Sequence, residues 1–187
     1  MIERCLMIAR FQPLHYGHLR AITYCREIAG EVIIAVGMAS QSHTPENPFT
    51  AGERIEMIRR TLKWAGLNLN DFITVTIPTL EVSRVSVHYV KLYSPPFTKV
   101  VSLNPIIRRL FVEEGYIVLT PPVESRDKLR GSYIRKLMVK GDDWKELVPP
   151  PVIEVINEVD GVNRVRMLYR ERLPGYYVID QYVDDYD

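Results

Sequence analysis

The amino-acid sequence predicts an α/β fold, a doubly wound parallel sheet with a small C-terminal helical appendage. Short apolar runs of strand length recur through the first two thirds of the chain, and segments with helical periodicity lie between most of them. This alternation is typical of a parallel sheet whose two faces are covered by helices. After Pro121 and Pro122 the strand-like runs end and two helical patterns follow, which indicates the appendage.

The expected elements follow in order along the chain. Strands are expected where apolar and β-branched residues dominate, at residues 5–9, 32–36, 73–77, 99–102 and 116–120. Helices are expected at residues 19–29, 51–64, 85–93 and 105–114, and in the appendage at 132–139 and 151–159. The second helix has a clear start, because Thr50 is a good N-cap and Glu53 completes a capping box.

The length of 187 residues favours a single domain over two. We divide this domain into an α/β core at 1–122, the helical appendage at 123–172 and a tail at 173–187. The tail mixes tyrosine and valine with acidic residues. Its sequence leaves open whether it forms a hairpin arm, an oligomer contact or a frayed end.

The composition is that of an ordinary globular protein, with 47% hydrophobic residues, 25% charged residues and a net charge of +1. This balance gives no overall field that would recruit nucleic acid or an anionic membrane, so any anion site must be local. The sequence shows no signal peptide and no apolar run of about 18 residues. We therefore expect a cytoplasmic protein in which Cys5 and Cys25 are buried free thiols, with a disulfide between them left open.

The most informative segment runs from Arg10 to His18, directly after the first expected strand. It places His15 and His18 three residues apart across Gly17. Residues at this spacing share one face of a helix, and a helix N-terminus attracts anions through its free N–H groups and its dipole. Both rings can therefore address one polyphosphate, and Gly17 lets the backbone come close to it. The spacing also fits a pair of metal ligands or two ordinary turn histidines, although a structural zinc site usually has about four ligands.

Three polar turns follow expected strands, at residues 10–18, 37–50 and 102–105. In an open parallel sheet, ligands bind beyond the carboxyl ends of the strands, near the point where the strand order changes direction. The three turns would together enclose a cleft of nucleotide size. The alternative is that they are only connections.

The segment from Leu129 to Arg135 follows the same logic as the first motif. Gly131 and Ser132 stand at an expected helix start, and Arg135 lies three positions after Ser132 on the same face. Ser132 can cap the helix and donate to a phosphate oxygen, while Arg135 offers a planar fork for phosphate. By itself, this segment reads as an ordinary helix start followed by a solvated arginine.

Together, the two motifs resemble those of the nucleotidyltransferase superfamily that carries HxGH near its N-terminus and an ISGTxIR-like segment near its C-terminus. More closely, the chain resembles the archaeal type of nicotinamide mononucleotide adenylyltransferase. The resemblance covers most of residues 1 to about 165 and runs through RFQPLHYGH, SHTPENPFTAGER, SPPF, Asn104-Pro105, Arg126-Asp127 and GSYIR.

The resemblance implies a Rossmann-like sheet and an enzyme that joins nicotinamide mononucleotide to the adenylyl group of ATP, giving NAD and pyrophosphate. It also implies Mg²⁺ held mainly by substrate phosphates, and a homo-oligomer that is hexameric in archaeal members. The catalytic residues that it implies are His15, His18, Arg10 and Arg135. The implied ATP-binding residues are Ala9, Arg10, Phe11, His15, Gly17, His18, Asn104, Gly131, Ser132 and Arg135. The implied acceptor-binding residues are Gly37, His43, Val82 and Ser86.

The implied chemistry needs no strong general base, because a phosphomonoester has a second pKa of about 6 and is mostly ionised at neutral pH. The protein has to align two polyanions and stabilise the charge that builds on pyrophosphate. We therefore expect the imidazoles to donate hydrogen bonds to phosphate and not to shuttle protons. We expect Glu53 and Arg54 to serve the capping turn and a local ion pair, and His88 to be structural.

The chain departs from the family pattern at five positions. Ala9 and Leu103 stand where glycine is usual, Arg130 replaces a serine, and Ser132 replaces a threonine but keeps the hydroxyl. Ser86 stands where archaeal relatives carry a tryptophan that stacks on nicotinamide. Tyr89 could replace that stack. An acceptor such as nicotinic acid mononucleotide or flavin mononucleotide therefore stays open. So do an adenylyl- or cytidylyltransferase acting on another phosphomonoester, and a nucleotide-binding sensor without turnover.

Overall fold

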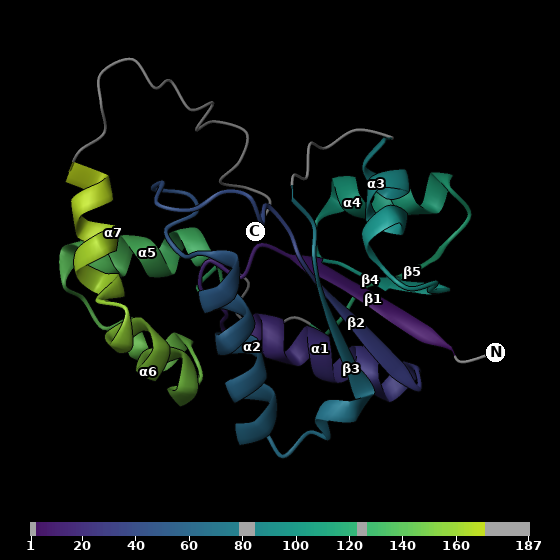
Figure 1. Cartoon of the computed structure of the whole chain (residues 1–187), viewed down its shortest axis with the longest axis horizontal. Helices are drawn as coiled ribbons and strands as arrows, with labels where there is room; N and C mark the ends of the chain where they lie inside the picture. Colours follow the sequence, from purple (N-terminus) through teal and green to yellow (C-terminus); the bar gives the residue numbers. More distant parts are fainter. Residues whose placement is uncertain (1–2, 79–84, 123–126, 171–187) are drawn as a thin grey trace.

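The computed structural model describes residues 3–78, 85–122 and 127–170 of the chain. Within these residues, five strands form one parallel sheet in the order β3-β2-β1-β4-β5 (Figure 1). The strands are β1 Arg4–Ala9, β2 Glu31–Val36, β3 Phe72–Thr76, β4 Lys99–Val101 and β5 Ile117–Leu119. The predicted Rossmann-like sheet is confirmed, and the predicted bounds of these strands are right to within one residue.

Helices cover both faces of the sheet (Figure 1). They are α1 Tyr16–Ile28 and α2 Ala51–Trp64 on one face, and α3 Val85–Tyr93 and α4 Pro105–Glu113 on the other. Two short 3₁₀ helices, η1 Leu69–Asp71 and η2 Lys145–Leu147, lie in the connections. The bounds of α2 and α3 are those predicted, and the capping box of Thr50 and Glu53 at the start of α2 is confirmed.

The central strand β1 shows why the sheet is covered on both sides. Its successive side chains point to opposite faces. Cys5 and Met7 pack in a core cluster with α1 and α2, whereas Leu6 and Ile8 pack in a second cluster with α3 and α4. Strands β2 and β3 extend the sheet to one side of β1, and β4 and β5 extend it to the other. The strand order therefore changes direction at β1, where a ligand site is expected in this class of fold.

The C-terminal helices form the appendage beside α2 (Figure 1). They are α5 Gly131–Lys140, α6 Pro150–Glu158 and α7 Gly161–Arg170. The first two were predicted, but α7 was not. Its sequence is rich in arginine, and its apolar face shows chiefly at the fully buried Val165. Arg164 on α7 bonds Glu53 on α2 at 2.8 Å and the Pro48 carbonyl at 3.2 Å, which joins the appendage to the loop before α2.

Cys5 and Cys25 are buried free thiols, as expected. The Cys5 thiol lies 3.1 Å from the Cys25 sulfur. That contact and then burial raise the pKa of the Cys25 thiol, so it stays protonated.

No helix in the described part of the chain is both long enough and apolar enough to cross a membrane. The tail at 173–187 lies outside the described residues. The division into core, appendage and tail stays a prediction.

Candidate active site

The two histidines cap the N-terminus of α1. His15 is the N-cap and His18 is the third helical residue, which confirms the predicted place of His18 in the first turn. Nδ1 of His15 accepts from the His18 N–H at 3.4 Å, and Nδ1 of His18 accepts from the His15 N–H at 3.3 Å. The two rings stack with their centroids 3.7 Å apart. The motif is thus a capping box built from two imidazoles, which fixes both rings.

This geometry also sets the protonation of the two rings. A ring nitrogen that accepts a hydrogen bond carries no proton, so a neutral ring in this arrangement carries its N–H at Nε2. Burial, and then the charges of His15 and Arg10, hold the pKa of His18 well below its usual range. His18 is therefore neutral at physiological pH and can donate through Nε2. These properties suit the predicted role of a donor to phosphate.

Gly17 and Phe11 were expected to lie against ATP, but their surroundings in the structure are mostly protein atoms. A methyl group at Gly17 would lie 3.0 Å from Nδ1 of His15 and 3.4 Å from Cβ of Leu129, so the glycine makes room for protein atoms. The side chain of Phe11 is fully buried, and its ring centroid lies 4.7 Å from that of His18. Only the backbone of Phe11 is therefore available to ATP, and this backbone takes a left-handed conformation with φ of 56°.

The second motif meets the first, as predicted. Arg135 is 1% exposed, and its Nη1 donates to the Gln12 carbonyl at 2.7 Å across 123 positions of sequence. A methyl group at Gly131 would lie 2.8 Å from the same carbonyl oxygen. The N-terminus of α5 is therefore seated directly against the β1–α1 loop. The roles of these residues toward ATP phosphates stay predictions.

The prediction that Ser132 caps α5 is wrong. The N-cap is Arg130, which has an extended backbone and makes no side-chain capping bond, and Ser132 is the second helical residue. The helix starts at Gly131, so Ser132 lies two positions beyond the N-cap position predicted for it. Its buried hydroxyl remains in the first turn.

Gln12 is a site residue that the sequence reasoning missed. Its side chain is 2% exposed and pairs with the backbone of Phe49, donating to the carbonyl and accepting from the N–H, both at 2.9 Å. It thereby ties the loop after β1 to the loop after β2. The sequence did contain a signal for this role, a glutamine between the apolar residues Phe11 and Leu14. A glutamine buried with such neighbours needs hydrogen-bond partners for its amide group.

The loop after β2 carries part of the predicted acceptor site. Gly37 is buried, and its N–H donates to the Ala9 carbonyl at 2.9 Å, so this loop starts directly beside the histidine motif. His43 is exposed, with Nδ1 3.0 Å from the hydroxyl of Ser42. Val82 lies outside the described residues. Ser86 lies in α3, but its side chain is not among those described.

The turn after β4 is the third polar turn at the carboxyl edge of the sheet. Asn104 is the N-cap of α4, and its side-chain oxygen accepts from the N–H groups of Ile106 at 2.9 Å and Ile107 at 3.2 Å. This oxygen therefore serves the helix, which leaves other atoms of Asn104 for ATP. Since β1, β2 and β4 are parallel, the three predicted turns all lie at the carboxyl edge of one sheet.

The prediction of a local ion pair for Arg54 is wrong. Its neighbour Glu53 pairs with Arg164. The Arg54 side chain is 0% exposed and donates to backbone carbonyls of Thr50, Arg10, Gly37 and Met38. A buried guanidinium bonded to backbone carbonyls therefore lies at the site, where the sequence analysis expected a local ion pair.

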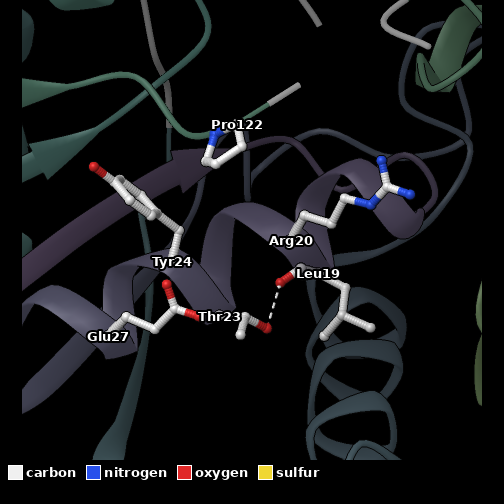
Figure 2. Close-up of a pocket in the computed structure, with 6 residues that line it drawn as sticks. All are labelled: Leu19, Arg20, Thr23, Tyr24, Glu27 and Pro122. Atoms are coloured by element: carbon white, nitrogen blue, oxygen red, sulfur yellow. Dashed lines mark hydrogen bonds between the residues drawn. The ribbon is translucent and has the colours of Figure 1, made fainter. Parts of the chain in front are cut away.

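A separate cavity of about 420 Å³ lies on the outer side of α1 (Figure 2). It is lined by Leu19, Arg20, Thr23, Tyr24, Glu27 and Pro122. The predicted site residues that the structure describes do not line it.

His88, expected to be structural, is exposed, and its Nε2 lies 3.8 Å from a Glu114 carboxylate oxygen.

The described residues contain no group of three or more His, Cys, Asp or Glu side chains that could hold a metal ion. Mg²⁺ prefers oxygen ligands and keeps several waters. The side chains gathered at the candidate site are imidazoles and guanidiniums, which suit phosphate oxygens.

Comparisons with known proteins agree with this geometry. The sequence pattern of the cytidylyltransferase-like family matches residues 6–137. A nicotinamide-nucleotide adenylyltransferase of Saccharolobus solfataricus is 44% identical over 165 residues, which cover 88% of this chain and 96% of that protein. One from Methanolobus tindarius is 45% identical over 165 residues, covering 88% of this chain and 94% of that protein.

A solved structure shares the fold. It is a bifunctional NMN adenylyltransferase/ADP ribose pyrophosphatase of Francisella tularensis, complexed with AMP and a Mn ion. The TM-score is 0.70 at 21% identity, and the match covers 91% of this chain and 53% of that one. At this identity the likeness concerns the fold alone.

Proposed function

Since the chain belongs to the cytidylyltransferase-like family and, within it, to the nicotinamide-nucleotide adenylyltransferases, we propose that it transfers the adenylyl group of ATP to nicotinamide mononucleotide. The products are NAD and pyrophosphate. The observation that carries the proposal is the meeting of the two motifs, because Arg135 donates to the Gln12 carbonyl beside the histidine pair and Gly131 lies too close to this carbonyl for a side chain to fit.

The donor half of the reaction rests on the first turn of α1 and the start of α5. The imidazoles of His15 and His18 donate through Nε2 to phosphate oxygens of ATP, and the free N–H groups at the start of α1 attract the same phosphates. Ser132 and Arg135 hold the β- and γ-phosphates, and Arg10 lies near the reacting groups. The backbone of residues 9–11 and the turn at Asn104 complete the ATP site.

The chemistry is a direct displacement at the α-phosphorus of ATP. An ionised phosphate oxygen of the mononucleotide forms a new bond to this phosphorus, and the bond from the α-phosphorus to the bridging oxygen of the β-phosphate breaks. The electron pair leaves with pyrophosphate, so the step consumes no oxidant and needs no covalent enzyme intermediate. The protein contributes alignment and stabilises the leaving charge.

Mg²⁺ is part of this proposal as an ion carried by the phosphates of ATP, where it neutralises charge on the leaving group. The imidazoles and guanidiniums of the protein bind other phosphate oxygens of the same ATP.

The acceptor side rests on Gly37, His43, Val82 and Ser86. A stacked aromatic ring contributes about 1 to 3 kcal/mol per base in nucleic-acid sites, so a serine at position 86 weakens recognition of the base unless another ring replaces it. Nicotinic acid mononucleotide and flavin mononucleotide are therefore further acceptors to be tested.

The test is an assay of purified protein with ATP, Mg²⁺ and nicotinamide mononucleotide. We expect pyrophosphate and NAD in equal amounts. Nicotinic acid mononucleotide and flavin mononucleotide serve as alternative acceptors in parallel reactions. Absence of pyrophosphate release with every acceptor, together with tight ATP binding, would replace the proposal by a nucleotide sensor.

The homo-oligomer expected from the resemblance, a hexamer, also belongs to the proposal. Sedimentation equilibrium of the full chain tests it directly. A monomer at micromolar concentration would contradict it.

A further inference from the structure

Arg54 of α2 is among the largest fully buried side chains of the described residues. Nη1 donates to the carbonyls of Arg10 at 2.9 Å and Gly37 at 2.7 Å, and Nη2 donates to the Met38 carbonyl at 3.1 Å. Nε donates to the Thr50 carbonyl at 3.2 Å. One guanidinium thus joins three stretches of chain that meet at the carboxyl edge of the sheet.

The two carbonyls on Nη1 occupy equivalent places on neighbouring strands. Ala9 pairs with Val36 at the ends of β1 and β2, so Arg10 and Gly37 are the next residues on each strand. Nη1 therefore binds matching peptide groups of the donor-side loop and the acceptor-side loop at once.

Each of these peptide groups precedes a strained residue. Phe11 has φ of 56° and Met38 has φ of 51°, both in the left-handed region that non-glycine residues rarely adopt. Such conformations persist where the surroundings fix them, and they gather at functional sites. Arg54 supplies such fixation at both turns, because it holds the carbonyl immediately before each strained residue.

The charge of Arg54 is also unusual. In the part of the chain that the structure describes, its hydrogen-bond partners are carbonyl oxygens and no carboxylate, since Glu53 bonds Arg164. Burial, and then the positive charge of Arg10, lower the pKa of Arg54 to about 10 against the smaller opposing effect of the Glu53 carboxylate, so Arg54 remains a cation at neutral pH. A buried cation without an ion pair suits a site that receives polyanions.

We propose that Arg54 is a positioning residue of the transfer reaction. Its guanidinium holds the loop after β1 and the loop after β2 in one fixed relation, and its charge is balanced by the phosphates of bound substrates. The proposal rests on the proposed function, and it adds a residue that touches neither the reacting atoms nor any ligand.

The experiment compares Arg54→Lys and Arg54→Gln with wild type. Lysine keeps the charge but has no planar fork that reaches several carbonyls, and glutamine keeps neither the charge nor the fork. We expect kcat to fall about 10²-fold in both variants, because displacement of a catalytic loop by 1 Å has an effect of that size. We expect the rise in Tm caused by ATP with Mg²⁺ to be kept in Arg54→Lys and lost in Arg54→Gln.

Arg164→Lys and Arg164→Gln are the matched controls. Arg164 also donates to backbone carbonyls, those of Pro48 and Val159, and it pairs with the Glu53 carboxylate, but it bonds none of the carbonyls that Arg54 holds. These controls should lower Tm while leaving kcat and the ATP-induced shift within about twofold of wild type. This separates positioning from a general contribution to stability.

Three results would overturn the proposal. They are a kcat of Arg54→Lys within threefold of wild type below its Tm, an ATP-induced shift in Arg54→Gln equal to that of wild type, and failure of both variants to fold. Turnover of the wild-type protein reports separately on the proposed function. The ATP-induced shift requires no turnover, so the two failures remain distinguishable.

Discussion

Gly131→Ala changes one hydrogen to a methyl group at the point where the two motifs meet. The added carbon would lie 2.8 Å from the Gln12 carbonyl oxygen, 3.3 Å from its carbonyl carbon and 3.2 Å from Nη1 of Arg135. The first contact is with backbone, which cannot swing away. Helix α5 must therefore move back, and the 2.7 Å bond from Arg135 to the Gln12 carbonyl lengthens. Overpacking of this kind costs about 1–3 kcal/mol.

For a chain of this length, 1–3 kcal/mol corresponds to a fall in Tm of roughly 2–12 °C. Activity should fall further than stability, by about 10²-fold in kcat measured well below the Tm, because Arg135 leaves its place. Pyrophosphate release and thermal unfolding measure the two quantities.

Gly52→Ala is the matched control, since its methyl group would meet only the Thr50 hydroxyl at 3.9 Å in an exposed helical turn. It should stabilise the protein by about 0.4–1 kcal/mol. If Gly131→Ala kept wild-type kcat and Tm, the close approach of α5 to the histidine motif would be refuted.

The remaining predictions concern the same two loops and the start of α2. The lowered pKa of His18 means that the unfolded chain takes up a proton first as pH falls below about 6.5. The free energy of unfolding should therefore decrease from pH 7 toward pH 5, and urea titrations of His18→Asn should show a weaker dependence. Arg135→Lys should lower kcat/KM by about 10²–10³-fold in the pyrophosphate assay, because the planar donor is lost; a change below threefold would speak against a phosphate role. Gln12→Ala should lower the free energy of unfolding by about 2–4 kcal/mol, since both backbone groups of Phe49 lose their partners. Thr50→Ala should lower it by about 1 kcal/mol through loss of the capping box, and an unchanged urea midpoint would contradict that assignment.

Elements with local signals could be predicted from the sequence. The start of α2 was predictable, because Thr50 and Glu53 satisfy its free N–H groups within one turn. The start of α1 was placed three residues late, since histidine is not among the usual N-cap residues, although His15 performs that task here.

Features that depend on distant chain segments could not be predicted. Arg54 was expected to serve the capping turn and a local ion pair with Glu53, yet its carbonyl partners include one 44 positions away. Ser132 looked like a cap, but the helix starts at Gly131, which lies close to the Gln12 carbonyl of the β1–α1 loop. In both cases tertiary packing determines the contacts of the residue, and the pattern of a single sequence does not show which distant segments pack together.

The most direct test of the account is a crystal structure of the protein with Mg²⁺ and a non-hydrolysable ATP analogue. We predict that phosphate oxygens lie about 2.7–3.2 Å from Nε2 of His15 and His18 on one side and from the Arg135 guanidinium on the other. A triphosphate bound elsewhere, or one contacted by only one of the two motifs, would contradict the central claim.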